Sequence, residues 1–181
     1  MSRRAKILVV SVLTIVSLLY GFGERLLTEG RKRPDNSVRV LKVNDGDTIT
    51  VVIGRRNERI RLIGMDAPEL QQRPWGDRAK DYLNKLVTVS SRHVTLEYDV
   101  ERRDKYGRLL AYVRLADGRL ANEEMLRAGY AVLFTFPPNV RYVDMFTAAQ
   151  QEARQKEIGI WGKDGIREQP VEFRRKHPRY R

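Results

Sequence analysis

One nine-residue stretch, Arg61 to Glu69, constrains the fold of this chain more than any other part of its sequence. Within residues 59–66, Ile60 and Leu62 alternate with Arg59 and Arg61, so a strand over this range sends its apolar side chains to one face and Arg61 to the other. The proline that follows Asp66 fixes its own φ and disfavours a helix before it, which holds Asp66 and Glu69 on a stiff corner. Two acids beside an outward arginine suit metal and phosphate chemistry. Taken alone, the stretch is better explained as an edge strand with a solvated charge and a turn.

Two β-branched segments precede this stretch. Residues 38–43 alternate weakly, residues 48–53 are rich in Val, Ile and Thr, and an Asn44-Asp-Gly-Asp47 turn lies between them. Asp47 shares the parity of the apolar positions in residues 48–53, so we expect its carboxylate at the inner end of a strand. Turn residue and metal ligand are both open interpretations of Asp47, whereas hairpin chemistry accounts for Asp45.

The remaining pattern adds two strands and three helices. Apolar spacing predicts a helix over 77–87, strands over 93–99 and 108–115, a short helix over 123–128 capped by Asn122, and a longer helix capped by Asn139 and ending near 158. The chain is therefore predicted to be an α+β protein with five strands and three helices. A short twisted sheet of this kind closes on itself, which favours an oligonucleotide-binding (OB) barrel.

Composition limits the chemistry. The chain has no cysteine and only two, distant histidines, which excludes disulfides and thiolate zinc sites and disfavours histidine metal sites and Ser-His triads. Any metal ion must then be held by oxygen. The formal charge of +12 favours a polyanionic partner, with nucleic acid as the first candidate and an anionic membrane surface as the second.

Charge and hydropathy divide the chain into four parts. Residues 1–23 join a basic start to an aliphatic stretch shorter than the ~20 residues of a membrane span, which predicts a signal peptide or a membrane anchor. Residues 24–37 are predicted as a linker, 38–162 as the folded domain and 163–181 as a flexible basic tail. We therefore expect export, with the domain secreted or anchored at the cell envelope outside the cytoplasm. Membrane contact is expected only through the N-terminal segment.

Four separated pieces make the chain resemble the staphylococcal nuclease (thermonuclease) family over about residues 38–162. The pieces occur in the family's order: Asp45-Gly-Asp-Thr48, Arg61-Leu-Ile-Gly-Met-Asp-Ala-Pro-Glu69, Asp104-Lys-Tyr-Gly-Arg108 and Asn122-Glu-Glu-Met-Leu-Arg-Ala-Gly129. The resemblance implies an OB-fold nuclease domain, a five-stranded β-barrel with three α-helices. It also implies a calcium-dependent phosphodiesterase that acts as an endonuclease on DNA and RNA.

The resemblance also implies roles for individual residues. Asp47 and Asp66 match the family's metal carboxylates, and the backbone carbonyl of Ala67, where a threonine is found in the best-known member, matches a further Ca²⁺ ligand. Arg61 and Arg108 match the phosphate-binding arginines, and Glu69 matches the general base. The expected substrate contacts are Lys105, Tyr106, Phe134 and Phe136.

Four alternatives remain, two for single residues and two for the whole domain. Phe134 and Phe136 are also explained as core residues, and Arg108 as a surface residue. A non-catalytic nucleic-acid-binding OB-fold module is expected to lose the arginines or the acids, and this chain keeps both. An envelope protein that uses the barrel for protein contacts would not depend on Ca²⁺, and no protein partner is implied.

Overall fold

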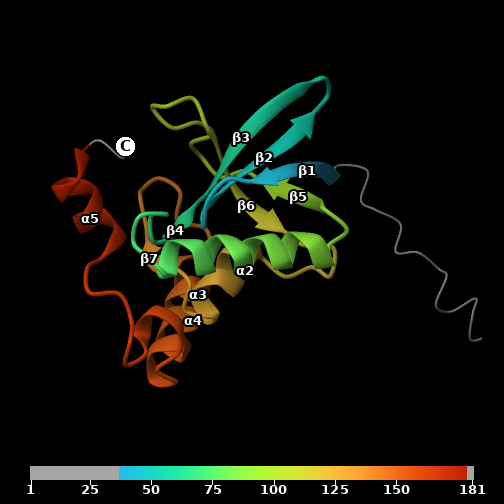
Figure 1. The fold of residues 1–181 in the computed structure, drawn as a ribbon. Coiled ribbons are helices and arrows are strands. Elements are labelled where there is room, and N and C mark those ends of the chain that lie inside the picture. The colour runs from blue at the N-terminus through green and yellow to red at the C-terminus, as the bar shows by residue number, and fades with distance from the viewer. Residues whose placement is uncertain (1–36, 179–181) are drawn as a thin grey trace, which may run out of the picture. The chain divides into compact units, whose positions relative to one another are not determined.

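Five strands close into a barrel in the computed structural model of this chain, which describes residues 37–178 (Figure 1). Around the barrel the order is β1 (Ser37–Val43), β2 (Thr48–Ile53), β3 (Arg56–Leu62), β6 (Leu109–Arg114) and β5 (His93–Glu97), which pairs again with β1. Neighbouring strands are antiparallel except β3 and β6, which are parallel. The predicted five-stranded OB-type barrel is confirmed.

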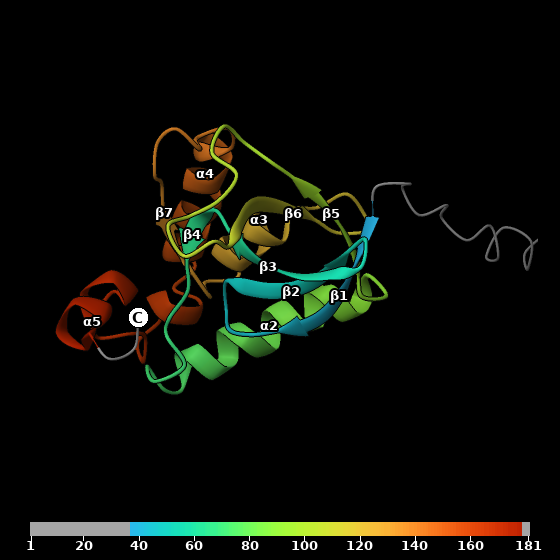
Figure 2. The same ribbon diagram turned by 90° about the horizontal axis from the view of Figure 1, so that it is seen from above.

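The other elements lie against this barrel. They are α2 (Trp75–Val89), α3 (Ala121–Arg127), α4 (Val143–Gln155), the 3₁₀ turn η1 (Gly159–Trp161), α5 (Pro170–Lys176), and a two-stranded sheet of β4 (Gly64–Asp66) and β7 (Val132–Phe134). In both views α5 lies at the end of the domain that also holds β4, β7 and the start of α2 (Figure 2).

One apolar core joins the barrel to three helices. Ile60 and Leu62 of β3 are fully buried, as their alternation with arginine predicted, while Arg59 is exposed. The core also contains the apolar faces of α2, α3 and α4, among them Leu83, Met125, Leu126, Phe146 and Ala149. Burial of these faces fixes the helices against the barrel wall, because apolar burial is the dominant favourable contribution to folding.

The chain leaves the barrel one residue after β3. The sequence predicted one strand over residues 59–66, but the structure divides it into β3 and β4. Gly64, the first residue of β4, has φ +80°, and a Cβ there would lie 2.5 Å from a ring carbon of Phe146. A glycine therefore permits both the turn and the close approach to α4. The turn directs β4 to β7 and sets Asp66 beside the barrel rather than on it.

Both predicted asparagine caps are wrong. Asn122 lies inside α3, fully buried, where it accepts a hydrogen bond from the Val113 amide (2.8 Å) and donates one to the Ile63 carbonyl (2.8 Å). Asn139 lies before α4 and pairs through its side chain with the backbone of Glu101. Each amide satisfies buried or partly buried backbone groups in another segment, which outweighs capping its own helix.

The basic tail contains a helix that the sequence did not predict. The tail was expected to be flexible, yet residues 170–176 form α5, with Pro170 at the first helical turn. The described residues therefore include a fourth α-helix beyond the three expected. No helix in residues 37–178 has the length and apolar character needed to cross a membrane. The predicted export or anchor segment lies outside the described residues.

Candidate functional site

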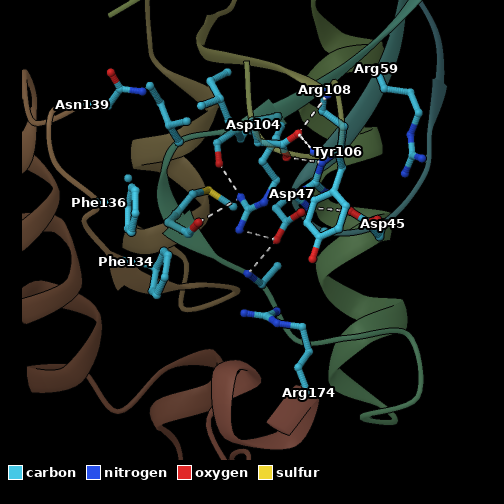
Figure 3. A pocket seen from close by; sticks show the side chains of 18 of the residues that line it. Asp45, Asp47, Arg59, Asp104, Tyr106, Arg108, Phe134, Phe136, Asn139 and Arg174 are labelled. Carbon is cyan, nitrogen blue, oxygen red and sulfur yellow. Dashed lines mark hydrogen bonds and ion pairs between the residues drawn. The ribbon is translucent and has the colours of Figure 1, made fainter. Parts of the chain in front are cut away.

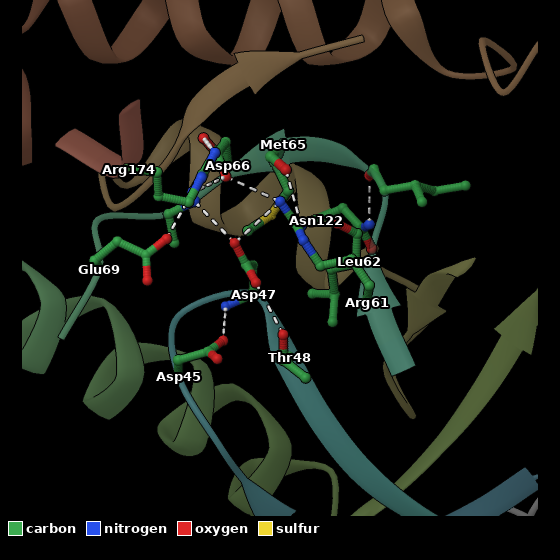
Figure 4. A network of polar contacts seen from close by, with 12 residues as sticks. Asp45, Asp47, Thr48, Arg61, Leu62, Met65, Asp66, Glu69, Asn122 and Arg174 are labelled. Carbon is green, nitrogen blue, oxygen red and sulfur yellow. Dashed lines mark hydrogen bonds and ion pairs between the residues drawn. The ribbon is translucent and has the colours of Figure 1, made fainter. Parts of the chain in front are cut away.

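Arg61 lies at the centre of a polar network where β3 passes into β4 (Figure 4). Its Nη2 atom lies 3.1 Å from Oδ2 of Asp47 and 3.0 Å from Oδ1 of Asp66. Its Nη1 atom donates to the backbone carbonyls of Leu62 and Met65. One guanidinium therefore holds two carboxylates and the turn between the strands in a fixed arrangement.

The turn before β2 sets the position of Asp47. Its Oδ1 accepts a hydrogen bond from the Thr48 hydroxyl (3.0 Å) and its Oδ2 accepts one from the Ala67 amide (3.2 Å). A Cβ on Gly46 would lie 2.6 Å from the Cβ of Ala67 and 2.8 Å from that of Ala79, so glycine is required for this turn to reach α2. Asp47 is 9% exposed, as expected for the inner end of a strand.

The corner after β4 holds the other two acids. Asp66 is fully buried, and the side chain of Glu69 is 25% exposed. The Glu69 amide donates to Oε1 of Gln72 (3.0 Å), and Gln72 donates in turn to the Glu168 carbonyl (2.9 Å). The corner is therefore joined to the C-terminal segment.

Arg174 of α5 reaches into the same network. Its Nη1 atom lies 3.1 Å from Oδ1 of Asp66 and 2.7 Å from Oε1 of Glu69, and its Nη2 atom lies 2.6 Å from Oδ2 of Asp66. Arg174 was not among the residues predicted for the site. Its only signal was a place in the Arg174-Arg-Lys176 run, which does not indicate which cation turns inward.

Arg108 lies on the wall of the cleft and forms an ion pair with Asp104. Its Nε donates to Oδ2 of Asp104 (2.7 Å), while Oδ1 of Asp104 accepts the backbone amides of Tyr106 and Arg108 (2.9 Å each). Asp104 thus builds the turn and orients the arginine at its exit. An Asp that precedes a tight turn commonly accepts hydrogen bonds from local amides, and this signal was present in the sequence.

These groups surround one open cleft of about 820 Å³ (Figure 3). Figure 3 shows Phe134 and Phe136 on one side, Tyr106 and Arg108 on the other, and Asp47 between them. The predicted site residues that line the cleft are Asp47, Arg61, Ala67, Glu69, Lys105, Tyr106, Arg108, Phe134 and Phe136, and Asp66 lies buried behind it. Phe134 and Phe136 are 39% and 66% exposed, so they are not core residues.

Burial raises the pKa of three acids at the site. It raises the pKa of Asp45 to about 7, with the neighbouring Asp47 carboxylate adding to the shift. Burial also raises the pKa of Asp66, although Arg61 and Arg174 oppose the change. The pKa of Glu69 is raised by burial too, against the opposing hydrogen bond from Arg174. Carboxyls that resist ionisation in a cleft are a common feature of catalytic and metal sites.

The donor set fits a hard cation. Within residues 37–178 no group of three or more His, Cys, Asp or Glu side chains is placed to hold a metal ion. Two carboxylate oxygens nevertheless face one positively charged nitrogen, Nη2 of Arg61, at 3.1 and 3.0 Å, and Arg174 adds a second cation. A divalent ion held only by oxygen would find two charged ligands here and would take the others from backbone, water and substrate.

Comparison with known proteins gives matches across most of this domain. A family model described as "Staphylococcal nuclease homologue" matches residues 59–163. The thermonuclease of Staphylococcus intermedius is 41% identical over 127 residues, which are 67% of this chain and 74% of that protein. Endonuclease YncB of Bacillus subtilis is 39% identical over 128 residues, 67% of this chain and 59% of that protein. The thermonuclease of Staphylococcus hyicus is 34% identical over 132 residues, covering 70% and 76% respectively. Helix α5 lies beyond the residues that the family model matches.

Proposed function

The chain belongs to the staphylococcal nuclease family, and on this premise we propose that it is a Ca²⁺-dependent endonuclease that hydrolyses phosphodiester bonds of DNA, RNA or both. Membership makes the chain a nuclease, and thus a hydrolase acting on nucleic acid. The dependence on calcium and the roles below are our proposal. One observation carries them: Asp47 and Asp66 pair with Arg61 beside a cleft that Glu69 and Arg108 line.

The metal would be held by the carboxylates of Asp47 and Asp66, with the backbone carbonyl of Ala67 as a further ligand. The contact that Ala67 makes in the structure is through its amide, to Asp47, so the carbonyl ligand stays a prediction. When bound, the ion supplies Lewis-acid polarisation of a phosphoryl oxygen. The other parts of the mechanism come from side chains of the chain itself.

Glu69 is the proposed general base. It lies on the cleft with a quarter of its side chain exposed, so a water molecule can reach it. Burial raises the pKa of its carboxyl, which makes the carboxylate a stronger base than an exposed glutamate. Glu69 would remove the proton as the water attacks phosphorus, an effect worth about 10² to 10⁴ in rate.

Arg61 and Arg108 are the proposed transition-state stabilisers. The attack gathers negative charge on the phosphoryl oxygens, and guanidinium groups are always protonated and can donate two parallel hydrogen bonds. Arg61 is held by two carboxylates and Arg108 by Asp104, so both are oriented before the substrate arrives. Donors that are already in place need no reorganisation at the moment of reaction.

The aromatic residues define the substrate class. Phe134, Phe136 and Tyr106 are exposed on the two sides of the cleft, where they can stack on bases. Lys105 lies beside Tyr106, its Nζ 5.2 Å from the ring centre, and can pair with a phosphate. Stacking without base-edge hydrogen bonds favours single strands with little sequence preference. Export of the domain through residues 1–23 is likewise proposed, from the sequence alone.

The test is cleavage of single-stranded DNA by the purified full-length chain, with Ca²⁺ or with EGTA. Cleavage should require Ca²⁺ and should fall at least about 10²-fold in Glu69→Gln and in Arg108→Ala. The exposed residues Glu172 and Arg56 give matched controls, Glu172→Gln and Arg56→Ala, which should retain activity. If the wild-type chain bound DNA and left it intact in Ca²⁺, it would be a non-catalytic OB-fold binding module instead.

A further inference from the structure

Helix α5 places a third guanidinium against the acids that are proposed to bind metal and to act as base. Arg174 contacts both oxygens of Asp66 and one oxygen of Glu69 (Figure 4). The side chain is 25% exposed, and it lines the cleft with Asp47 and Arg61. No role in the proposed hydrolysis has been given to it so far.

The position of Arg174 conflicts with that of a metal ion on Asp66. Oδ1 of Asp66 already accepts from Arg61 and Arg174, and Oδ2 accepts from Arg174 at 2.6 Å. A divalent cation would need the same oxygens and would repel a guanidinium at that distance. The ion and Arg174 therefore compete for one carboxylate.

Arg174 makes the ion pairs that join α5 to the acids of the site. Within the described part of the chain, the ion pairs that join α5 to the barrel side of the domain all involve Arg174, because Lys176 pairs with Glu168 of its own segment. A helix of seven residues is marginal without tertiary contacts. Loss of the Arg174 contacts would therefore remove the ion pairs that hold α5 at the cleft.

The segment before α5 is held independently. The indole of Trp75 donates to the Asp164 carbonyl (3.1 Å), and Gln72 donates to the Glu168 carbonyl (2.9 Å). These contacts do not involve the carboxyl groups of the site, because Gln72 meets Glu69 only at its backbone. Helix α5 can therefore leave the cleft while residues 164–168 stay in place.

We propose that a divalent cation bound at Asp47 and Asp66 displaces Arg174 and releases α5 from the cleft. The inference rests on the proposed function, since it assigns the metal to these carboxylates. In the metal-free chain Arg174 blocks the site in two ways, because it pairs with both the proposed metal ligand Asp66 and the proposed base Glu69. Binding of the cation to Asp47 and Asp66 then also frees Glu69 and the cleft from Arg174.

The first measurement is hydrogen–deuterium exchange of the full-length chain in EGTA and in saturating Ca²⁺. We expect amides of residues 170–176 to exchange faster with Ca²⁺, because opening of a segment exposes its backbone. Asp66→Asn should give fast exchange of the same segment in EGTA, since it weakens the Arg174 contact without any metal. Unchanged or slower exchange of α5 in Ca²⁺ would overturn the proposal.

The second measurement is Ca²⁺ affinity by calorimetry, without substrate. Arg174→Ala should bind Ca²⁺ at least about tenfold more tightly than the wild type, because loss of a single competing charge-assisted hydrogen bond is worth about that much and Arg174 makes two to Asp66. Arg175→Ala removes the same charge from an exposed position one residue along α5, and it should change the affinity much less. Equal effects of the two variants would mean that only net charge matters, and weaker binding by Arg174→Ala would mean that Arg174 supports the metal site. Either result overturns the proposal.

Failure of this inference is distinguishable from failure of the proposed function. A chain that binds Ca²⁺ and cleaves DNA while α5 stays in place overturns the displacement of Arg174 alone. A chain that takes up no Ca²⁺ in calorimetry overturns the displacement and the metal dependence together.

Discussion

Arg61 combines a structural and a chemical role in one side chain. Its guanidinium bonds to two backbone carbonyls at the turn after β3 and to the carboxylates of Asp47 and Asp66. Four acceptors around a planar group require donors that point in fixed, divergent directions. A charge alone at this position would not reproduce that arrangement.

We therefore expect Arg61→Lys to be nearly as damaging as Arg61→Ala. Both should lower kcat/KM on single-stranded DNA by about 10² to 10³, because an ammonium cannot hold the phosphoryl oxygens through a fork. Arg59→Lys, on the same face of β3 but exposed, is the matched control and should be close to wild type. Circular dichroism would confirm that each variant is folded. Near-normal turnover in the lysine variant would show that charge alone suffices.

The local sequence was enough to predict the placement of site residues that depends only on near neighbours along the chain. Asp66 and Glu69 were expected on one corner, and Asp47 was expected to point inward, because proline geometry and strand parity act over a few residues. Arg174 was not found, since it lies 108 positions from Asp66 along the chain. Its contact exists only once α5 has formed and docked, and a run of basic residues does not encode that.

At the scale of elements, a second polar network joins β5, β6 and α4. Glu97 of β5 accepts hydrogen bonds from Nε of Arg114 in β6 (2.5 Å) and from the hydroxyl of Tyr142 at the start of α4 (2.7 Å). Tyr112 of β6 donates to Asp99 (2.9 Å), just after β5. The network lies away from the cleft, so its disruption should affect stability rather than chemistry.

Glu97→Gln should lower stability in a pH-dependent way. The hydrogen bond from Arg114 is the main cause that holds the pKa of Glu97 below its ordinary value of 4.5. A lowered pKa means that the stabilisation is present above pH 4.5 and is lost as the pH falls through the folded-state value. We expect about 1 kcal/mol at pH 7, because the pair is partly exposed, and a Tm lower by about 2 to 4 °C.

Thermal unfolding of the wild type and of Glu97→Gln between pH 3 and pH 8 measures the pH dependence of this stabilisation. The Tm difference between wild type and Glu97→Gln should be constant near neutral pH and should shrink below pH 4.5. Glu172→Gln, at an exposed position, should show no such difference. A Tm difference that persists at pH 3 would mean that Glu97 stabilises the fold by packing and not by its charge.

Most elements of the fold were predictable from the sequence. The residues at which they end, and the places where they depart from local preference, were not. Alternation of apolar residues, together with the β-branched composition of residues 48–53, identified the five barrel strands. The break at Gly64 and the burial of Asn122 depend on α4 and β6, which meet those residues only in the folded chain. Tertiary contacts of this kind override the local preferences from which strands and caps are read.

At the scale of the whole molecule, the distribution of charge matters more than its sum. The chain has a net charge of +12, yet Asp45, Asp47, Asp66 and Glu69 gather at one cleft. Burial raises the pKa of three of them, which shows that their negative charges are costly where they lie. The basic surface favours approach of a polyanion, and the acidic centre favours a cation between it and the phosphate.

The native state alone brings these acids together, so Ca²⁺ should stabilise the whole fold. At a Ca²⁺ concentration about 100 times Kd, the linkage relation gives ~2.7 kcal/mol, and the Tm should rise by about 5 to 10 °C over that in EGTA. Asp47→Asn removes one proposed ligand and should abolish most of this rise, whereas Asp81→Asn, an exposed acid on α2, should retain it. Scanning calorimetry of the wild type and the two variants, each in Ca²⁺ and in EGTA, measures this rise in Tm. If Asp47→Asn kept the full rise, the stabilising ion would bind elsewhere, and the acids at the cleft would have to be balanced by Arg61 and Arg174 alone.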